Sequence, residues 1–337
     1  MTSALTGRVV GAAGGLVADR LVGEPPDAAH PVVWFGRAMT RVEETTYADR
    51  RVAGVVHTLI GVGAAAGVGA IVERLLGRAP AAALATAVCV AGSMLDDEAA
   101  AVASLVRSGD VDGARQRLRS LVGRDTTELG ESEISRAGIE SVAENTVDAV
   151  TASWWWAGLG GAPAVVAHRA SNTLDAMVGH RTERYIRFGW ASARLDDVLA
   201  YVPARLTALT VAAVRPRRSM EIARVVRRDA GAHPSPNGGI VEAAFAAALD
   251  VRLGGTNRYA GGVEDRGTLG SGRPPRVDDV GRAIRLRRQV SAAPAALAVG
   301  IVVVTELRRR LSGGSGSPSS ISRRRSNLVA HRNPGAG

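Results

Sequence analysis

Long apolar stretches alternate with polar segments along the chain. Five of them approach the ~20 residues that a helix needs to cross the hydrocarbon core of a bilayer. They are 52–72, 79–95, 149–167, 198–214 and 290–305. The first three contain no aspartate, glutamate or arginine, whereas the last two are shorter or interrupted. The pattern predicts an all-α, multi-spanning integral membrane protein with three to five hydrophobic helices. The alternative is a large soluble protein with a buried helical core.

Polar segments separate these stretches. Residues 96–148 hold twelve acidic residues and six arginines with helical periodicity, and residues 215–289 are rich in loop-forming residues. From Glu306 onward the sequence is of low complexity, rich in arginine, serine and glycine, which is typical of disorder. We therefore predict a single helical membrane domain over 1–305 and a disordered tail over 306–337. Within the domain, residues 96–148 form a polar helical loop and residues 215–289 form a polar loop.

A pentapeptide, Asn-Thr-aliphatic-Asp-Ala, occurs twice, at 145–149 and 172–176, on either side of the apolar stretch 149–167. A straight helix over that stretch would extend about 28 Å and put the two copies on opposite sides of a bilayer. Gly158, Gly160, Gly161 and Pro163 lie in its middle, however, and glycine and proline break helices. We predict a re-entrant hairpin over 149–167, buried by protein, that returns both copies to one face.

Acidic side chains form a stripe before the first pentapeptide copy. Arg136, Glu140, Glu144 and Asp148 recur every four residues and would share one face of a helix. Such a stripe is often simply solvated. Next to a membrane-length segment, however, acids are costly unless they bind a cation or a partner. Asn145 lies in the same short segment.

A second acidic group follows the apolar stretch. Asn172 and Asp175 are one helical turn apart, and Asp196 and Asp197 are adjacent to each other, with Arg194 just before them. Adjacent carboxylates at a helix start can serve as caps that complement the helix dipole. Together with the other acid and several arginines, they also suit Mg²⁺ held with a substrate phosphate.

Two loops add further candidates. His30 lies in the turn-rich segment GEPPDAAHPVVWFGR, where a structural role is the alternative to a ligand role. The segment HPSPNGG precedes an apolar helix, and backbone amides at a helix start can bind phosphate. Ser235 and Asn237 supply side-chain donors there. Glu242 in the first turn would oppose an anion, so a plain capped turn is the alternative.

Composition restricts the chemistry. The net charge is +10, and all 42 basic residues are arginine. The absence of lysine excludes a Schiff-base lysine and a Walker-type phosphate loop. Cys89 is the single cysteine, so the chain has neither a disulfide framework nor a cysteine metal cluster. The basic surplus is not interleaved with aromatic residues, so nucleic acid is not an expected partner.

Four ordered blocks, at 19–37, 123–150, 169–206 and 235–262, carry a resemblance to a known family. In these blocks the chain resembles the CobD/CbiB family of cobalamin-biosynthesis membrane proteins. The resemblance implies a multi-pass protein of the cell membrane that makes adenosylcobinamide phosphate. Such an enzyme joins a carboxyl of adenosylcobyric acid to the amine of aminopropanol phosphate, using ATP and Mg²⁺.

The chain departs from the family pattern at two places. After the first pentapeptide copy the family generally has glycine and then an alanine–proline pair, whereas this chain has Ala149 and Ala152–Ser153. Where the family often shows SPNAGW, this chain has Gly238 and Ile240. These changes leave the acids in place and bear only on the local geometry of the helix break.

The residues and the resemblance together suggest a mechanism. ATP would convert a carboxylate, which is a poor electrophile, into an acyl phosphate that the amine attacks with general-base help. Glu140 or Glu144 would be the base. The candidate residues are Glu140, Glu144, Asn145 and Asp148 for catalysis, Asp175, Asp196 and Asp197 for metal, and His30, Arg124, Asn172, Arg181, Arg194, Ser235 and Asn237 for substrate or phosphate.

Two other functions stay open from the sequence. A membrane prenyl-type transferase also uses Asn-x-x-Asp acids and Mg²⁺, but such enzymes usually add aspartates at four-residue steps, and here Gly179 follows Asp175 at that step. A non-catalytic scaffold for corrinoid enzymes would turn over no nucleotide. The expected partners are the corrinoid acid, the amine phosphate, the lipid bilayer and other enzymes of the corrinoid pathway.

Overall fold

The computed structural model describes residues 2–24, 26–259 and 262–313. The chain divides into two compact units, residues 1–299 and 300–337, and all elements below belong to the first except the end of the last helix. The elements are α1 (Thr2–Val22), η1 (Asp27–Ala29), α2 (Pro31–Thr46), α3 (Arg51–Leu76), α4 (Arg78–Cys89), α5 (Gly92–Arg107), α6 (Val111–Leu118), α7 (Glu131–Thr146), η2 (Val147–Thr151), α8 (Ala152–Val178), α9 (Trp190–Val214), η3 (Pro216–Arg218), α10 (Ser219–Asp229), η4 (Ala230–Ala232), α11 (Gly238–Leu249), β1 (Leu253–Tyr259), β2 (Gly262–Leu269) and α12 (Val277–Gly313).

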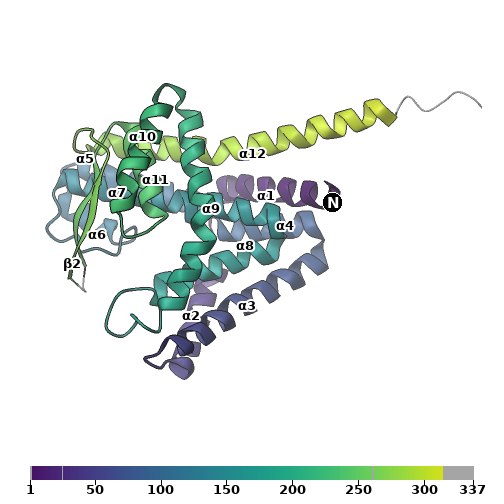
Figure 1. Ribbon diagram of the computed structural model, residues 1–337, viewed down its shortest axis with the longest axis horizontal. Coiled ribbons are helices and arrows are strands. Elements are labelled where there is room, and N and C mark those ends of the chain that lie inside the picture. Colours follow the sequence, from purple (N-terminus) through teal and green to yellow (C-terminus); the bar gives the residue numbers. More distant parts are fainter. Residues whose placement is uncertain (1, 25, 260–261, 314–337) are drawn as a thin grey trace, which may run out of the picture. The chain divides into compact units, whose positions relative to one another are not determined.

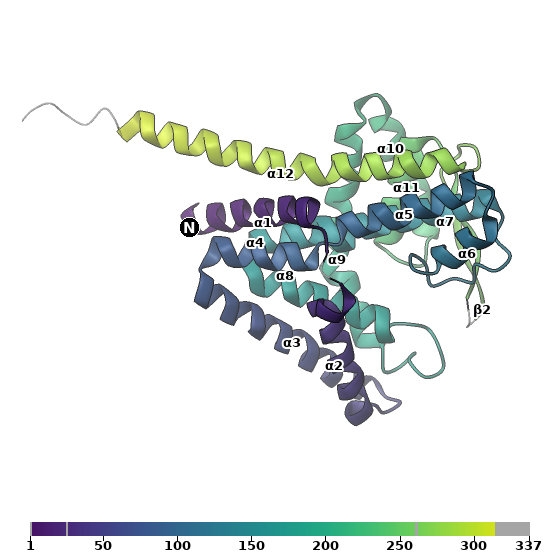
Figure 2. The ribbon, with the colours of Figure 1, turned by 180° about the vertical axis from the view of Figure 1, so that it is seen from behind.

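The first unit contains two groups of helices. The apolar helices α1, α3, α4 and α8 pack together, and α9 crosses at one end of them (Figure 1). Beyond α9 lie α10, α11 and the strands, together with α5, α6 and α7, which Figure 2 shows from behind. Helix α11 is central to this second group, because nearly all of its residues are buried. The pocket described below lies where the two groups meet.

Three helical segments of the described residues are long and apolar enough to cross a membrane: Arg51–Leu76, Arg78–Arg107 and Trp190–Val214. On the first of them Leu59 is 65% exposed and Leu75 is 77% exposed. A continuous apolar surface of this kind marks a contact with a membrane or another protein. The helices agree with the predicted all-α membrane protein and indicate membrane association, while the number of spans stays a prediction.

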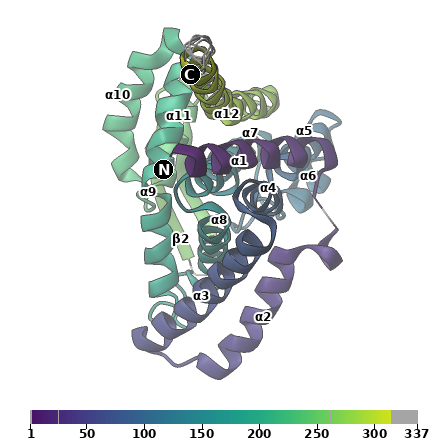
Figure 3. The ribbon, with the colours of Figure 1, turned by 90° about the vertical axis from the view of Figure 1, so that its right-hand side faces the viewer.

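Small residues allow α3 to pack closely on α8. A Cβ atom at Gly61 would lie 2.9 Å from a side-chain carbon of Leu174, and one at Gly69 would lie 2.7 Å from Pro163 Cα. Close backbone approach through small residues is the usual packing mode of helices in lipid. Helix α1 packs on α4 beside them (Figure 3).

Helix α8 is broken in its middle. Gly161 has φ 70° and ψ −155°, which are not helical values. The carbonyl oxygen of Leu159, before the break, accepts a bond of 3.1 Å from Arg8. The N–H of Ala162, after the break, donates to Glu73 at 3.2 Å. Arg8 and Glu73 also pair with each other at 3.1 Å, so one ion pair caps both ends exposed by the break.

This capping predicts a loss of stability when Glu73 is replaced by alanine. The variant would leave the Ala162 N–H and the Arg8 guanidinium without their acceptor, so we expect the free energy of unfolding to fall by about 1–3 kcal/mol. Denaturation of the detergent-solubilised protein measures it. The control is Glu128→Ala, since Glu128 is 82% exposed and its ion pair with Arg258 is long, at 3.4 Å. Equal stability of the two variants would show that the cap contributes nothing.

Two features depart from the predicted organisation. Strands β1 and β2 pair as an antiparallel hairpin within the predicted loop 215–289, which adds a small sheet to an otherwise helical chain. Helix α12 continues to Gly313, past the predicted boundary at 305, because glutamate, leucine and arginine at the start of the tail favour helix. The remainder, 314–337, lies outside the described residues, so the prediction of disorder is untested there.

Candidate functional site

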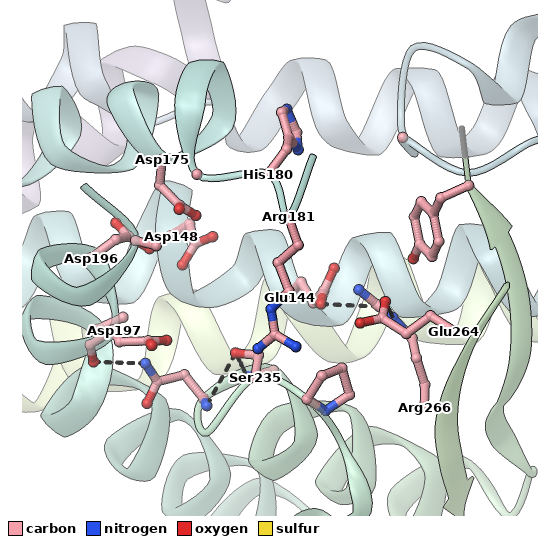
Figure 4. Close-up of a pocket in the computed structure, with 18 of the residues that line it drawn as sticks. Glu144, Asp148, Asp175, His180, Arg181, Asp196, Asp197, Ser235, Glu264 and Arg266 are labelled. Carbon is pink, nitrogen blue, oxygen red and sulfur yellow. Dashed lines mark hydrogen bonds and ion pairs between the residues drawn. The ribbon is translucent and has the colours of Figure 1, made fainter. Parts of the chain in front are cut away.

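A pocket of about 820 Å³ lies between the two groups of helices. It is lined from η2 and the ends of α7 and α8, from the first half of α9, from the segment after α8, and from the strands (Figure 4). Its charged lining residues are Glu144, Asp148, Asp175, His180, Arg181, Asp196, Asp197, Glu264 and Arg266. Acids from widely separated segments therefore converge on one cavity.

The two pentapeptide copies meet in this pocket. Asp148 and Asp175 both line it, although they are 27 positions apart and a straight helix between them would extend about 40 Å. Helix α8 therefore does not run straight between the copies, and its break at Gly161 lies about midway between them. Whether the broken segment enters a membrane stays a prediction. Asn172 lies near both copies, because its side chain favours the charged form of Asp148 and is close to Asp196.

Burial disfavours the charged form of the carboxylates in this pocket. Burial, and then the charge of Glu144, raises the pKa of Asp148 from 3.8 to about 7. The Oδ1 atom of Asp196 is buried and has no hydrogen-bond partner among the residues that the structure describes. Carboxylates that lie close together, with too few positively charged side chains to neutralise them, are stabilised by a bound cation. Mg²⁺ prefers oxygen donors. The predicted metal residues Asp175, Asp196 and Asp197 all line the pocket, so the donor set fits Mg²⁺.

A second cluster adjoins the aspartates. Glu144, His233 and Glu242 each present one potential metal-ligand atom, and these atoms lie within 4.8 Å of one another. Arg266 approaches Glu144 at 3.5 Å and Glu242 at 3.7 Å. Burial, and then the charge of Glu144, raises the pKa of Glu242 from 4.5 to about 8. Helix α11 therefore carries a buried acid next to Glu144, which lines the pocket.

Comparison with known proteins identifies the family. A protein-family model described as CobD/Cbib protein matches residues 12–287 of this chain. The chain belongs to the CobD/CbiB family.

Several relatives are similar over nearly their whole length. A cobalamin biosynthesis protein CobD of Mycobacterium tuberculosis is 49% identical over 301 residues, which cover 88% of this chain and 96% of the relative. Proteins of the same name from Pelobacter propionicus and Rhodobacter capsulatus are 41% and 39% identical, covering 87% and 83% of this chain and 94% and 92% of the relatives. No solved structure matches the chain. Membership of the CobD/CbiB family supports a role in cobalamin biosynthesis.

Most of the predicted site residues line the pocket of this CobD/CbiB chain. They are Glu144, Asp148, Asp175, Arg181, Asp196, Asp197, Ser235 and Asn237, with Asn172 close to two of them. Ala152 and Ser153, which replace the family's alanine–proline pair, are buried in the first turn of α8. The helix nevertheless breaks further on, so these departures do not prevent that break.

Glu140 and Arg124 are absent from the pocket lining among the described residues, because they bind each other. Their side chains form a buried ion pair, and Glu140 also accepts the N–H of Gly254 at 2.8 Å. Arg124 donates to Asn257 at 2.6 Å. This network anchors β1 against α7. The spacing put Glu140 on the stripe of Glu144 but could not show that an arginine from a distant loop neutralises it.

Three other predicted residues also lie away from the pocket lining. His30 caps α2, since its Nδ1 accepts the N–H of Val32 at 3.2 Å. The side-chain amide of Asn145 donates to the carbonyl of Ser141 at 2.9 Å. Arg194 is 66% exposed and lies 3.6 Å from Asp197. These contacts account for the positions of the three side chains, and their roles in catalysis or substrate binding stay predictions.

The SPNGG loop, residues 235–239, leads into α11 and binds N–H groups at the start of that helix. Ser235 Oγ accepts the N–H groups of Asn237 and Gly238 at 3.3 and 3.1 Å. Asn237 accepts from Arg205 at 2.9 Å and donates to the carbonyl of Asp197 at 2.8 Å. The loop thus ties α11 to α9 at the wall of the pocket. Its predicted role in phosphate binding stays a prediction.

Proposed function

We propose that this chain catalyses ATP-dependent amide formation between adenosylcobyric acid and aminopropanol phosphate, giving adenosylcobinamide phosphate, as a multi-pass protein of the cell membrane. The observation that carries the proposal is the convergence of six acids and two arginines in one pocket of a CobD/CbiB chain. Joining an amine to a carboxylate requires activation by a nucleotide, whose phosphates need both a cation and arginine.

The residues of the pocket fit these needs. Asp175, Asp196 and Asp197 would hold Mg²⁺, which when bound neutralises phosphate oxygens. With no lysine in the chain, the phosphate would be bound by arginine, and Arg181 extends into the pocket toward Ser235 (Figure 4). The amine must lose a proton before it attacks. Glu144 is better placed than Glu140 to take it, because Glu144 lines the pocket and Glu140 is occupied by Arg124.

Nucleotide turnover tests the proposal. The purified full chain in detergent is given ATP, Mg²⁺, adenosylcobyric acid and aminopropanol phosphate, and ADP and the amide are quantified. We expect one ADP per amide, and ADP release only when both the acid and the amine are present. A comparison of aminopropanol with its phosphate defines the amine substrate. Failure to release ADP with all substrates present would indicate a scaffold, and diphosphate release from a prenyl diphosphate would indicate a transferase.

A further inference from the structure

Glu144, His233 and Glu242 form a group that the proposed reaction does not use as a unit. His233 Nε2 lies 3.2 Å from Glu242 Oε1, and both of these side chains are fully buried, at 0% exposure. Glu144 belongs to the same group and lines the pocket. The group thus reaches from the interior of the second helix group to the cavity.

Several buried atoms of this group lack a well-formed hydrogen bond. Within the described residues, Nε2 of His233 and both carboxylate oxygens of Glu242 make no hydrogen bond of good geometry, although Nε2 and Oε1 lie 3.2 Å apart as an ion-pair contact. Buried polar groups are nearly always hydrogen-bonded, and a buried carboxylate without compensation is strongly unfavourable. Because these atoms and the Glu144 carboxylate face a common point, one cation between them would satisfy them together.

The backbone leaves space for the Glu144 side chain beside this point. A Cβ atom at Gly238 would lie 2.9 Å from Glu144 Oε1 and 3.0 Å from His233 Cε1. Both distances are shorter than ordinary van der Waals contact. Glycine at the first position of α11 is therefore what lets Glu144 and His233 approach each other.

The charges around the group leave a deficit of two. Arg266 is shared by Glu144, Glu242 and Glu264, which it approaches at 3.5, 3.7 and 3.7 Å. If a bound cation keeps Glu242 ionised, one guanidinium against three carboxylates leaves a charge of −2 when His233 is neutral. A divalent cation balances that charge. Each carboxylate offers about four lone-pair positions, so the contacts with Arg266 leave others available.

The neutral imidazole of His233 has two tautomers, which exclude each other. Nδ1 lies 3.2 Å from the carbonyl oxygen of Ser235 and 3.0 Å from its N–H. If Nδ1–H donates to that carbonyl, Nε2 has a free lone pair, which is the usual arrangement of a metal-binding histidine. If Nδ1 accepts the N–H instead, Nε2 carries the proton and points at Glu242, and no ion binds.

We propose that Glu144, His233 and Glu242 bind one divalent transition-metal ion, which Glu144 connects to the pocket. One imidazole and two carboxylates suit Zn²⁺ or Mn²⁺ better than Mg²⁺, which prefers oxygen donors alone. This site is separate from the aspartates to which Mg²⁺ is assigned above, and it stands whether or not the amide reaction does.

Direct ion binding tests this site. The purified full chain in detergent is treated with a chelator, and ZnCl₂ or MnCl₂ is then titrated by calorimetry without ATP or substrates, with bound metal counted by mass spectrometry. We expect one tightly bound ion per chain. Glu242→Gln, which keeps the shape and removes the charge, should weaken its binding at least about tenfold. Gly238→Ala should also weaken it, because the added Cβ displaces Glu144.

Matched variants define the result that overturns the site. Glu128→Gln, at an exposed position, and Asp196→Asn, in the aspartate group, should retain the tightest ion. Absence of a stoichiometric ion in the wild type, or equal affinity in Glu242→Gln and the wild type, contradicts the site. Loss of the ion in Asp196→Asn but not in Glu242→Gln assigns it to the aspartates and also contradicts it. If Glu242→Gln does not fold, His233→Gln gives the same comparison.

Discussion

Replacing Asp196 by asparagine is expected to lower the rate of amide formation by at least about 10²–10³-fold while leaving the protein as stable as the wild type or more so. Asp196 lines the pocket, and its Oδ1 atom is buried without a partner in the described part of the chain. Asparagine has the same shape, can still lie close to Asn172, and removes one charge from a group of mutually repelling acids. If Asp196 serves to bind a cation, its replacement should therefore lower the activity and not the stability of the protein.

The control for this prediction is Asp278→Asn. This variant makes the same chemical change at an exposed position. The Asp278 side chain is 85% exposed and pairs with Arg107 at 3.5 Å. We expect its rate and its melting temperature to match the wild type. ADP and amide are measured for both variants alongside thermal denaturation. Wild-type activity in Asp196→Asn would remove this residue from the metal site, and a large loss of stability would make its role structural.

The sequence was sufficient to predict a break in α8 and the meeting of the two pentapeptide copies in one pocket, while the re-entrant hairpin stays a prediction. Two facts made this possible: the same polar residues flank an apolar stretch, and that stretch contains Gly161 and Pro163. Local conformational preferences of glycine and proline act within a few residues, so they can be read from one segment. The convergence of Asp148 with Asp175 follows from that single break.

Contacts between distant segments could not be predicted in the same way. Arg266 reaches the pocket only because β1 and β2 pair as a hairpin, and nothing in its own segment indicates this. Glu140 shares the periodicity of Glu144, yet Arg124 neutralises it. Glu242 did have a signal, a single acid in an otherwise apolar helix, which a buried partner such as His233 explains. Periodicity shows which face a residue occupies and not what packs against that face.

Replacing Gly161 by alanine is expected to disrupt both the fold and the site. The backbone at Gly161, with φ 70° and ψ −155°, is a conformation that side chains with a Cβ rarely adopt, and the strain is about 1–3 kcal/mol. The added Cβ would also lie only 2.2 Å from Glu73 Oε2, which adds about 1–3 kcal/mol of overpacking and disturbs the ion pair with Arg8. Together these effects should lower the free energy of unfolding by about 2–6 kcal/mol.

The matched control is Gly67→Ala in α3, where an added Cβ would meet nothing within 4 Å. Alanine is favoured over glycine inside a helix by roughly 0.5–1 kcal/mol, so this variant should be as stable as the wild type or more so. Denaturation in detergent and the amide assay are measured for both. The break brings Asp148 and Asp175 together. The fraction of Gly161→Ala protein that remains folded should therefore also be inactive in the amide assay. A stable and fully active Gly161→Ala protein would show that the break in α8 is not what assembles the pocket.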